Sequence, residues 1–273
     1  MHPAFTFGST ELAGIWVAKF EASGLSSAVD VKPNVVSLRS MTLDAIFTAC
    51  RNMETTYGAR YGWETSGSGI DTHLIKNIEW GAVTYLTQST YGKNSEVWIN
   101  PNSNYITGQS GTSVSQTYST STYPYNDATY GVNASTTGNI YGIYDMSGGT
   151  IEYTASYVNN GNPNLTTYCS SIINAASQYK DVYASGGDTQ SGNYEANSGK
   201  KGDAIYETSA ASAGATSWYG DHSYMPVSTV PVFLRGGDYY NTTTSGIFHF
   251  SRISGEANLG ITFRPVVLVS GAL

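Results

Sequence analysis

Hydrophobic positions recur with a helical period in two segments of the chain. The first covers residues 42–57, where apolar side chains return every three or four residues: Leu43, Ile46, Phe47, Cys50 and Met53. The second covers residues 72–91, with the stripe Leu74, Ile75, Ile78, Ala82, Val83 and Leu86. This spacing places apolar side chains on one face of an α-helix. Gly58 and Gly92 are positioned to end the two helices, and residues 61–69 between them are predicted to be a glycine-rich loop.

The rest of the pattern predicts short strands joined by long polar segments. Residues 12–22 alternate around Ile15, Val17 and Phe20, which indicates an early strand. β-rich runs cover residues 230–234 and 261–269, and a third, short helix is predicted within residues 168–183. Small polar residues without a helical stripe fill residues 100–139 and 188–217. We therefore expect one α+β domain over residues 1–273, with two main helices, short strands and long ordered loops.

Composition narrows the function classes. Only 12% of the residues are charged and 40% are hydrophobic, which excludes a coiled coil and a disordered acidic chain. A net charge of -7 with 13 Lys and Arg residues argues against a nucleic-acid partner. No apolar run approaches the roughly 18 residues of a membrane span, so no span is expected. The 22 Tyr residues among many small polar residues are typical of binding loops, although Tyr also packs well in β structure.

Metal-binding and redox motifs are sparse. The two cysteines, Cys50 and Cys169, are too few for a metal framework, and buried free thiols are favoured over a disulfide bridge. The four histidines show no close spacing, so we expect them to be packed or surface residues instead of ligands: His2, His73, His222 and His249.

Three blocks of sequence carry a family resemblance. They are Gly14–Glu21, the central run Gly138–Thr154, which contains GIYDMSGGTIEYT, and Phe233–Gly237, followed by Phe263–Val267. Their order and spacing resemble the formylglycine-generating enzyme (sulfatase-modifying factor) family. The resemblance implies a C-type-lectin-like fold.

The chemistry of that family is not expected here. Its oxidases hold copper with two cysteines after the Arg-Gly-Gly motif, whereas residues 238–252 contain no Cys. Gly149 stands where the enzymes have an Asn that helps to bind calcium, so calcium is not supported. Asp145 and Glu152 are read as ion ligands or, preferably, as carboxylates that fix loops through backbone hydrogen bonds. We expect no catalytic residue, metal or cofactor; the alternative is a formylglycine-generating-type oxidase or a divergent metalloenzyme.

A second resemblance fits the end of the chain better. Residues 235–265 resemble the segment that is rewritten in the variable proteins of diversity-generating retroelements and in related bacteriophage tail proteins. The resemblance implies an exchangeable display segment within a fixed frame. The frame is expected at Gly246, Phe248, Phe250, Gly255, Ala257, Gly260, Phe263 and Arg264. The candidate ligand-binding residues are Asp238, Tyr239, Tyr240, Thr243, His249, Ser251, Arg252, Ile253, Glu256, Asn258 and Leu259.

Alternation within this segment predicts how it is displayed. His249 and Ser251 should lie on one face, opposite Phe248 and Phe250. Arg235 is expected to be buried with the frame, as is Arg264. The predicted function is receptor recognition in a phage tail or on a bacterial cell surface, with an unknown protein or glycan as ligand. Such a surface is compatible with a homo-oligomer, and a passive structural module is the third interpretation.

Overall fold

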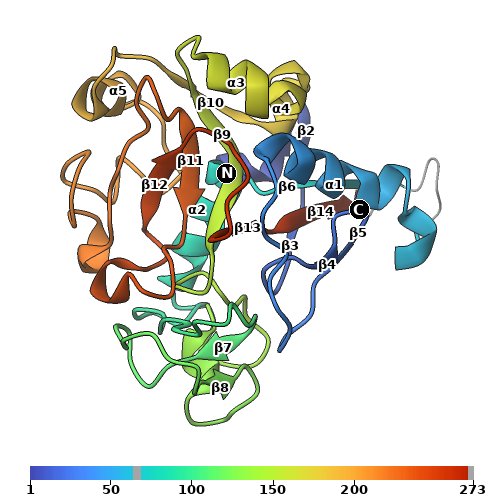
Figure 1. Ribbon diagram of the computed structural model, residues 1–273, viewed down its shortest axis with the longest axis vertical. Helices are drawn as coiled ribbons and strands as arrows, with labels where there is room; N and C mark the ends of the chain where they lie inside the picture. Colours follow the sequence, from blue (N-terminus) through green and yellow to red (C-terminus); the bar gives the residue numbers. More distant parts are fainter. Residues whose placement is uncertain (64–68, 270–273) are drawn as a thin grey trace.

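The computed structural model describes residues 1–63 and 69–269, and these residues form an α+β architecture (Figure 1). Its central sheet is built around the long strand β9, which pairs with β11 along one edge and with β10 and β13 along the other. β12 extends the sheet beyond β11. The strands are β9 (Ile151–Asn159), β10 (Asp181–Ala184), β11 (Val232–Arg235), β12 (Phe250–Ile253) and β13 (Ile261–Phe263).

A second, antiparallel sheet has the order β3-β14-β6, with β3 at Trp16–Val17, β6 at Ile70–Leu74 and β14 at Pro265–Val269. Only Arg264 separates β13 from β14, so one continuous segment links the two sheets. Three short hairpins complete the strands: β1 (Thr6–Phe7) with β2 (Thr10–Glu11), β4 (Ser23–Leu25) with β5 (Ala28–Asp30), and β7 (Gln109–Ser110) with β8 (Tyr123–Pro124).

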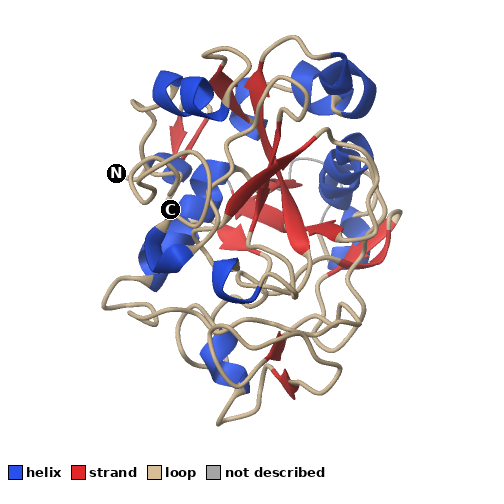
Figure 2. Ribbon diagram, turned by 60° about the vertical axis from the view of Figure 1, so that its left-hand side comes forward, coloured by secondary structure: helices blue, strands red, loops and turns tan. Residues whose placement is uncertain are grey.

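Helices lie around the strands, and long loops fill the remaining surface (Figure 2). The α-helices are α1 (Leu43–Thr55), α2 (Asn77–Thr87), α3 (Pro163–Tyr168), α4 (Ser170–Asn174) and α5 (Gln190–Ala196). Short 3-10 turns occur at Pro3–Phe5, Gly58–Tyr61, Gly131–Ala134, Ser177–Tyr179, Trp218–Gly220 and Thr242–Thr244. Within the described ranges, no helix is long and apolar enough to span a bilayer.

The first predicted helix is confirmed as α1. Thr42 caps its start by accepting a 3.2 Å hydrogen bond from the amide of Ala45, and the whole apolar stripe is buried. The second predicted helix is wrong in its first part, because residues 70–74 form β6. β6 pairs with β14 from Leu74 opposite Pro265 to Ile70 opposite Val269, and this pairing overrides the helical spacing.

One other predicted element is shorter than expected. The predicted strand at residues 12–22 pairs with β14 only at Trp16 and Val17. The short helix predicted within residues 168–183 is confirmed as α4, which carries Ile172 and Ile173, and residues 181–183 belong to β10 alongside β9. The predicted loop at residues 61–69 lies partly outside the described residues, which omit 64–68.

Two buried arginines lie near the buried Trp80. The guanidinium carbons of Arg235 and Arg264 lie 5.6 and 5.7 Å from the centroid of the Trp80 ring. Arg264 forms a fully buried ion pair with Glu152, in which Nε lies 2.9 Å from Oε2. Arg235 donates to the backbone carbonyl of Asp203 at 3.3 Å. The expected burial of both arginines is confirmed.

The central sequence block forms a tight turn that carries a buried carboxylate. Gly148 and Gly149 have φ angles of 70° and 73°, and a Cβ on Gly149 would lie 2.5 Å from Oε1 of Glu21. Both carboxylate oxygens of Asp145 accept from the amide of Gly108 at 2.9 Å. Asp145 therefore fixes a loop through backbone hydrogen bonds, as the preferred interpretation predicted.

Candidate ligand-binding site

The predicted display segment is held in the sheets at both ends. It begins at the end of β11, where Gly236 and Gly237 have φ angles of 86° and 76° and turn the chain out of the sheet. The chain returns as β12, antiparallel to β11, and then re-enters the central sheet as β13 beside β9. The residues between these strands are thus presented from a fixed base.

A hollow of about 350 Å³ lies on this segment, between the 238–241 loop and strands β12 and β13. Its volume is near the lower end of the range for small-molecule sites, about 300–1,000 Å³. Six of the eleven predicted ligand-binding residues line the hollow: Asp238, Tyr240, His249, Ser251, Ile253 and Asn258. The structure therefore brings together residues that are spread over twenty positions of sequence.

The register of β12 explains which side chains reach the hollow. Ser251 lies opposite Leu234 of β11 and both line the hollow, as does Ile253 two residues further on. Phe250, directly before Ser251, is fully buried on the other face, in a cluster with Phe233. The predicted alternation is confirmed for Phe250 and Ser251, whereas Phe248 and His249 precede the strand.

The prediction that His249 is displayed at the surface is wrong, and Asp238, another candidate ligand-binding residue, is buried as well. His249 is only 2% exposed, because its Nδ1 donates a 2.8 Å hydrogen bond to the backbone carbonyl of Thr244 and its ring packs 5.6 Å from that of His222. Asp238 is 6% exposed, because it directly follows the Gly236-Gly237 turn beneath the loop. Both residues line the hollow from below the surface.

Tyrosine rings build one rim of the hollow. Tyr240 is 57% exposed and lies edge-to-face with Tyr239 at a centroid distance of 5.3 Å. Tyr239 is half-buried against Tyr105 at 5.2 Å, and the guanidinium carbon of Arg39 lies 3.7 Å from the Tyr105 ring. These contacts hold a rigid aromatic rim beside the opening.

Besides Tyr239, four predicted residues do not line the hollow. Thr243 and Leu259 have exposed side chains outside the hollow. Arg252 points to the opposite face of β12, where it donates a 3.1 Å hydrogen bond to the carbonyl of Met225. Glu256 contributes its backbone carbonyl as the acceptor for the hydroxyl of Tyr153, at 2.6 Å.

Eight lining residues were not among the predicted ligand-binding residues, and four of these eight are aromatic or polar. Tyr105 comes from the long polar segment at residues 100–139, and His222 and Tyr224 come from the chain just before β11. Asn241 belongs to the display segment, and its Oδ1 accepts from the amide of Asp238 at 2.7 Å. For Tyr105 and Tyr224, the only indication in the sequence is the abundance of Tyr in the loops, which does not show which tyrosines line a site.

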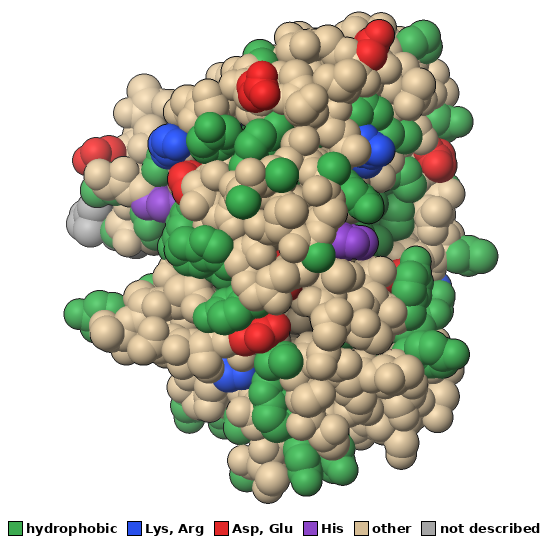
Figure 3. All heavy atoms as spheres, turned by 90° about the vertical axis from the view of Figure 1, so that its left-hand side faces the viewer, with side chains coloured by type: hydrophobic (Ala, Val, Ile, Leu, Met, Phe, Trp, Pro, Cys, Tyr) green, Lys and Arg blue, Asp and Glu red, His purple; other side chains and the backbone are tan. Residues whose placement is uncertain are grey.

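The hollow is close to electrically neutral. Its lining, within the described part of the chain, contains no Lys or Arg. Burial lowers the pKa of His249 to about 3 and also lowers the pKa of His222, so both rings are neutral at physiological pH. Burial raises the pKa of the Asp238 carboxyl to about 7. Figure 3 shows that charged side chains are also few and scattered across one whole face of the molecule.

Comparison with models of known protein families finds no family that matches this chain, and no curated protein matches it either. In the described residues, no group of three or more His, Cys, Asp and Glu side chains is arranged to hold a metal ion. The hollow itself is therefore the feature on which a functional argument rests.

Proposed function

We propose that this chain is a ligand-binding protein with a C-type-lectin-like fold, similar to the variable proteins of diversity-generating retroelements and related phage tail proteins. Residues 235–265 form its recognition segment. The observation that carries the proposal is the hollow, because six of the predicted recognition residues line it. Its role is attachment of a phage tail or a bacterial cell to a receptor on another surface.

The way in which the segment is anchored supports this function. Phe248 and Phe250 are fully buried. The loop at residues 238–245 is closed by a 2.8 Å hydrogen bond that Ser245 Oγ donates to the carbonyl of Asp238. A preformed site loses little conformational entropy on binding, so that affinity follows from the side chains it presents. Exchange of Tyr240, Asn258 or Ser251 would alter the ligand without altering the frame.

Binding to cells tests the proposal directly. The fluorescently labelled protein is incubated with a panel of bacterial isolates, and bound protein is measured by flow cytometry. We expect binding to a subset of isolates, reduced on the order of ten-fold or more by Tyr240→Ala and by Ser251→Arg, which fills the hollow. Tyr91→Ala is the matched control, because Tyr91 is 86% exposed outside the hollow. Equal loss in the control, or no dependence on the two hollow variants, contradicts the proposal.

A further inference from the structure

Two buried polar atoms of residues that line the hollow have no hydrogen-bond partner among residues 1–63 and 69–269. The backbone carbonyl of Thr244 only accepts hydrogen bonds, so Nδ1 of His249 carries the proton and Nε2 presents a lone pair. Nε2 has no hydrogen-bond partner among the described residues, although the side chain is 98% removed from solvent. Oδ1 of Asp238 is likewise buried without a partner in the described chain. A buried acceptor left unpaired costs about 1–3 kcal/mol, which a bound donor would recover.

Donors stand beside these acceptors. Asn241 accepts from the Asp238 amide through Oδ1, and Asn258 accepts from the Gly260 amide through Oδ1 at 2.8 Å. Each side-chain NH₂ group is therefore left as a donor, and neither has a hydrogen-bond partner in the described part of the chain. Acceptors and donors on one wall suit a ligand whose groups both donate and accept, and a hydroxyl group does both.

The remaining lining selects for a neutral ligand with an apolar face. No cationic side chain among the described residues lines the hollow to pair with a phosphate, sulfate or carboxylate, and the Asp238 carboxyl would oppose such an anion. Tyr240 and Tyr105 supply aromatic surface, on which the C–H face of a saccharide ring can pack. A peptide backbone also offers donors and acceptors, but it has no flat apolar ring face to pack on Tyr240, so the aromatic lining favours the saccharide.

We propose that the hollow binds a neutral saccharide unit of a cell-surface glycan. One hydroxyl group donates to Nε2 of His249, a second donates to Oδ1 of Asp238, and the NH₂ groups of Asn241 and Asn258 donate to saccharide oxygens. The ring packs against Tyr240. This inference rests on the proposed function and specifies the class of ligand that the same site recognises.

The probe is a printed array of neutral and acidic glycans, read with the labelled full chain. We expect binding to a set of neutral saccharides and none to their sulfated or sialylated forms. Asp238→Leu removes the acceptor with little change of volume, and it should weaken binding to the positive spots on the order of ten-fold. Asp188→Leu is its control, because Asp188 is exposed outside the hollow.

A second variant guards against misfolding. His249→Phe keeps an aromatic ring and removes Nε2, and its thermal unfolding midpoint is measured with that of Asp238→Leu. If either folded variant loses glycan binding while the control keeps it, the inference is supported. Unchanged binding in both folded variants overturns it.

Treated cells separate the two proposals. Periodate cleaves vicinal diols of saccharides, whereas a protease removes surface proteins. Loss of cell binding after periodate, with binding kept after protease, supports the saccharide. Loss after protease alone overturns the saccharide and leaves the proposed receptor function intact. Absence of binding to every untreated cell and every glycan overturns both.

Discussion

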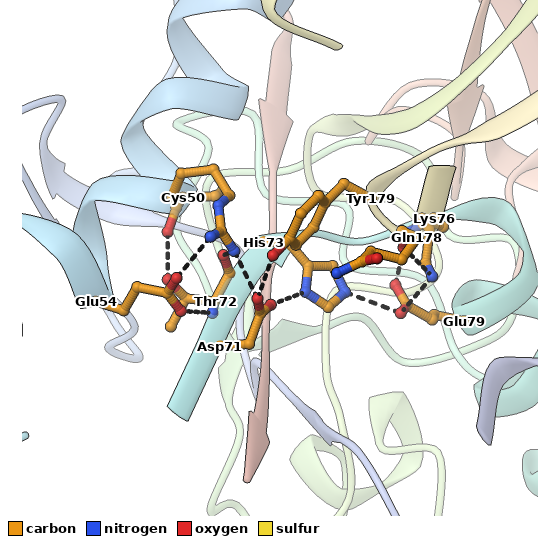
Figure 4. A network of polar contacts seen from close by, with 10 residues as sticks. Cys50, Glu54, Asp71, Thr72, His73, Lys76, Glu79, Gln178 and Tyr179 are labelled. Carbon is orange, nitrogen blue, oxygen red and sulfur yellow. Dashed lines mark hydrogen bonds and ion pairs between the residues drawn. The ribbon is translucent and has the colours of Figure 1, made fainter. Parts of the chain in front are cut away.

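Nε2 of His73 lies 2.9 Å from Oε1 of Glu79, and Nδ1 on the other side of the ring lies 2.9 Å from Oδ1 of Asp71 (Figure 4). Both oxygens are acceptors, so both ring nitrogens donate and the buried imidazole is a cation. Lys76 approaches Glu79 at 3.3 Å, and Arg51 approaches Asp71 at 2.8 Å. This row of charges joins α1, β6 and the start of α2.

The stability of the protein should fall as the pH rises above neutrality. Burial by itself lowers the pKa of His73, but Glu79 and Asp71 outweigh burial and raise it above the usual value of about 6.5. A group whose folded-state pKa is raised stabilises the fold below the unfolded pKa, and this contribution is lost as pH rises through the folded pKa. Urea unfolding at about pH 6 and about pH 9 measures the loss.

The variant His73→Gln isolates this residue, because Asp238 also has a raised pKa and contributes in the same direction. The free-energy difference between the wild type and His73→Gln should be largest near pH 6 and should shrink toward pH 9. A difference that stays constant over this range would show that His73 is neutral in the fold.

The ion pair between Arg264 and Glu152 should be sensitive to the loss of one partner. Both side chains are fully buried, so Glu152→Gln leaves a desolvated guanidinium without its counter-charge. We expect a loss of about 3–5 kcal/mol in the free energy of unfolding. Asp30→Asn, which breaks the solvent-exposed pair of Asp30 with Arg60, is the control and should change stability little. Similar losses in both variants would contradict the assignment.

The two cysteines should be inert in the folded protein. Cys50 and Cys169 are free and fully buried, as the favoured interpretation of the sequence predicted. Burial raises the pKa of both thiols, that of Cys169 to about 12, so almost no thiolate forms near neutral pH. A thiol-reactive dye should label neither residue until denaturant unfolds the chain, and a reducing agent should leave the unfolding temperature unchanged. Rapid labelling of the native protein would contradict this expectation.

The display segment should tolerate exchange at its surface and not in its frame. Tyr240→Asn and Leu259→Ser change exposed side chains, so the free energy of unfolding should shift by only about 0.5 kcal/mol. Phe248→Ala and Phe250→Ala remove fully buried rings and should cost about 3–5 kcal/mol each. Urea unfolding of the four variants measures the contrast. Equal costs at the exposed and buried positions would remove the distinction between frame and display.

Part of the fold was readable from local pattern, and part was not. α1 was predicted because Leu43, Phe47 and Cys50 recur at helical spacing, and in the structure they lie on one buried face. The start of α2 was misplaced because Leu74 and Ile75 continue its apolar stripe although Leu74 ends β6. Pairing with β14 decides that boundary, and the partner strand lies far away in the sequence.

In the candidate site, too, the features that depend on local sequence were predicted, and those that depend on distant segments were not. Ser251 was placed opposite Phe250 by the period of a strand, because that period depends only on neighbours along the chain. The burial of His249 was not predicted, because it depends on the Thr244 carbonyl and on the ring of His222, which a different loop supplies. Tyr105 was missed for the same reason.

The pairing of β3 with β14 has a consequence for how the protein is made. A ribosome releases Trp16 and Val17 early, and their partners Val267 and Val266 emerge only after the whole recognition segment. The second sheet therefore closes last, by contacts of long sequence separation, which form slowly. A substitution between β11 and β14 that keeps β14 from reaching its place would leave the edges of β3 and β6 unpaired and open to proteases and chaperones. Completion of the second sheet during synthesis therefore depends on the last strand to emerge.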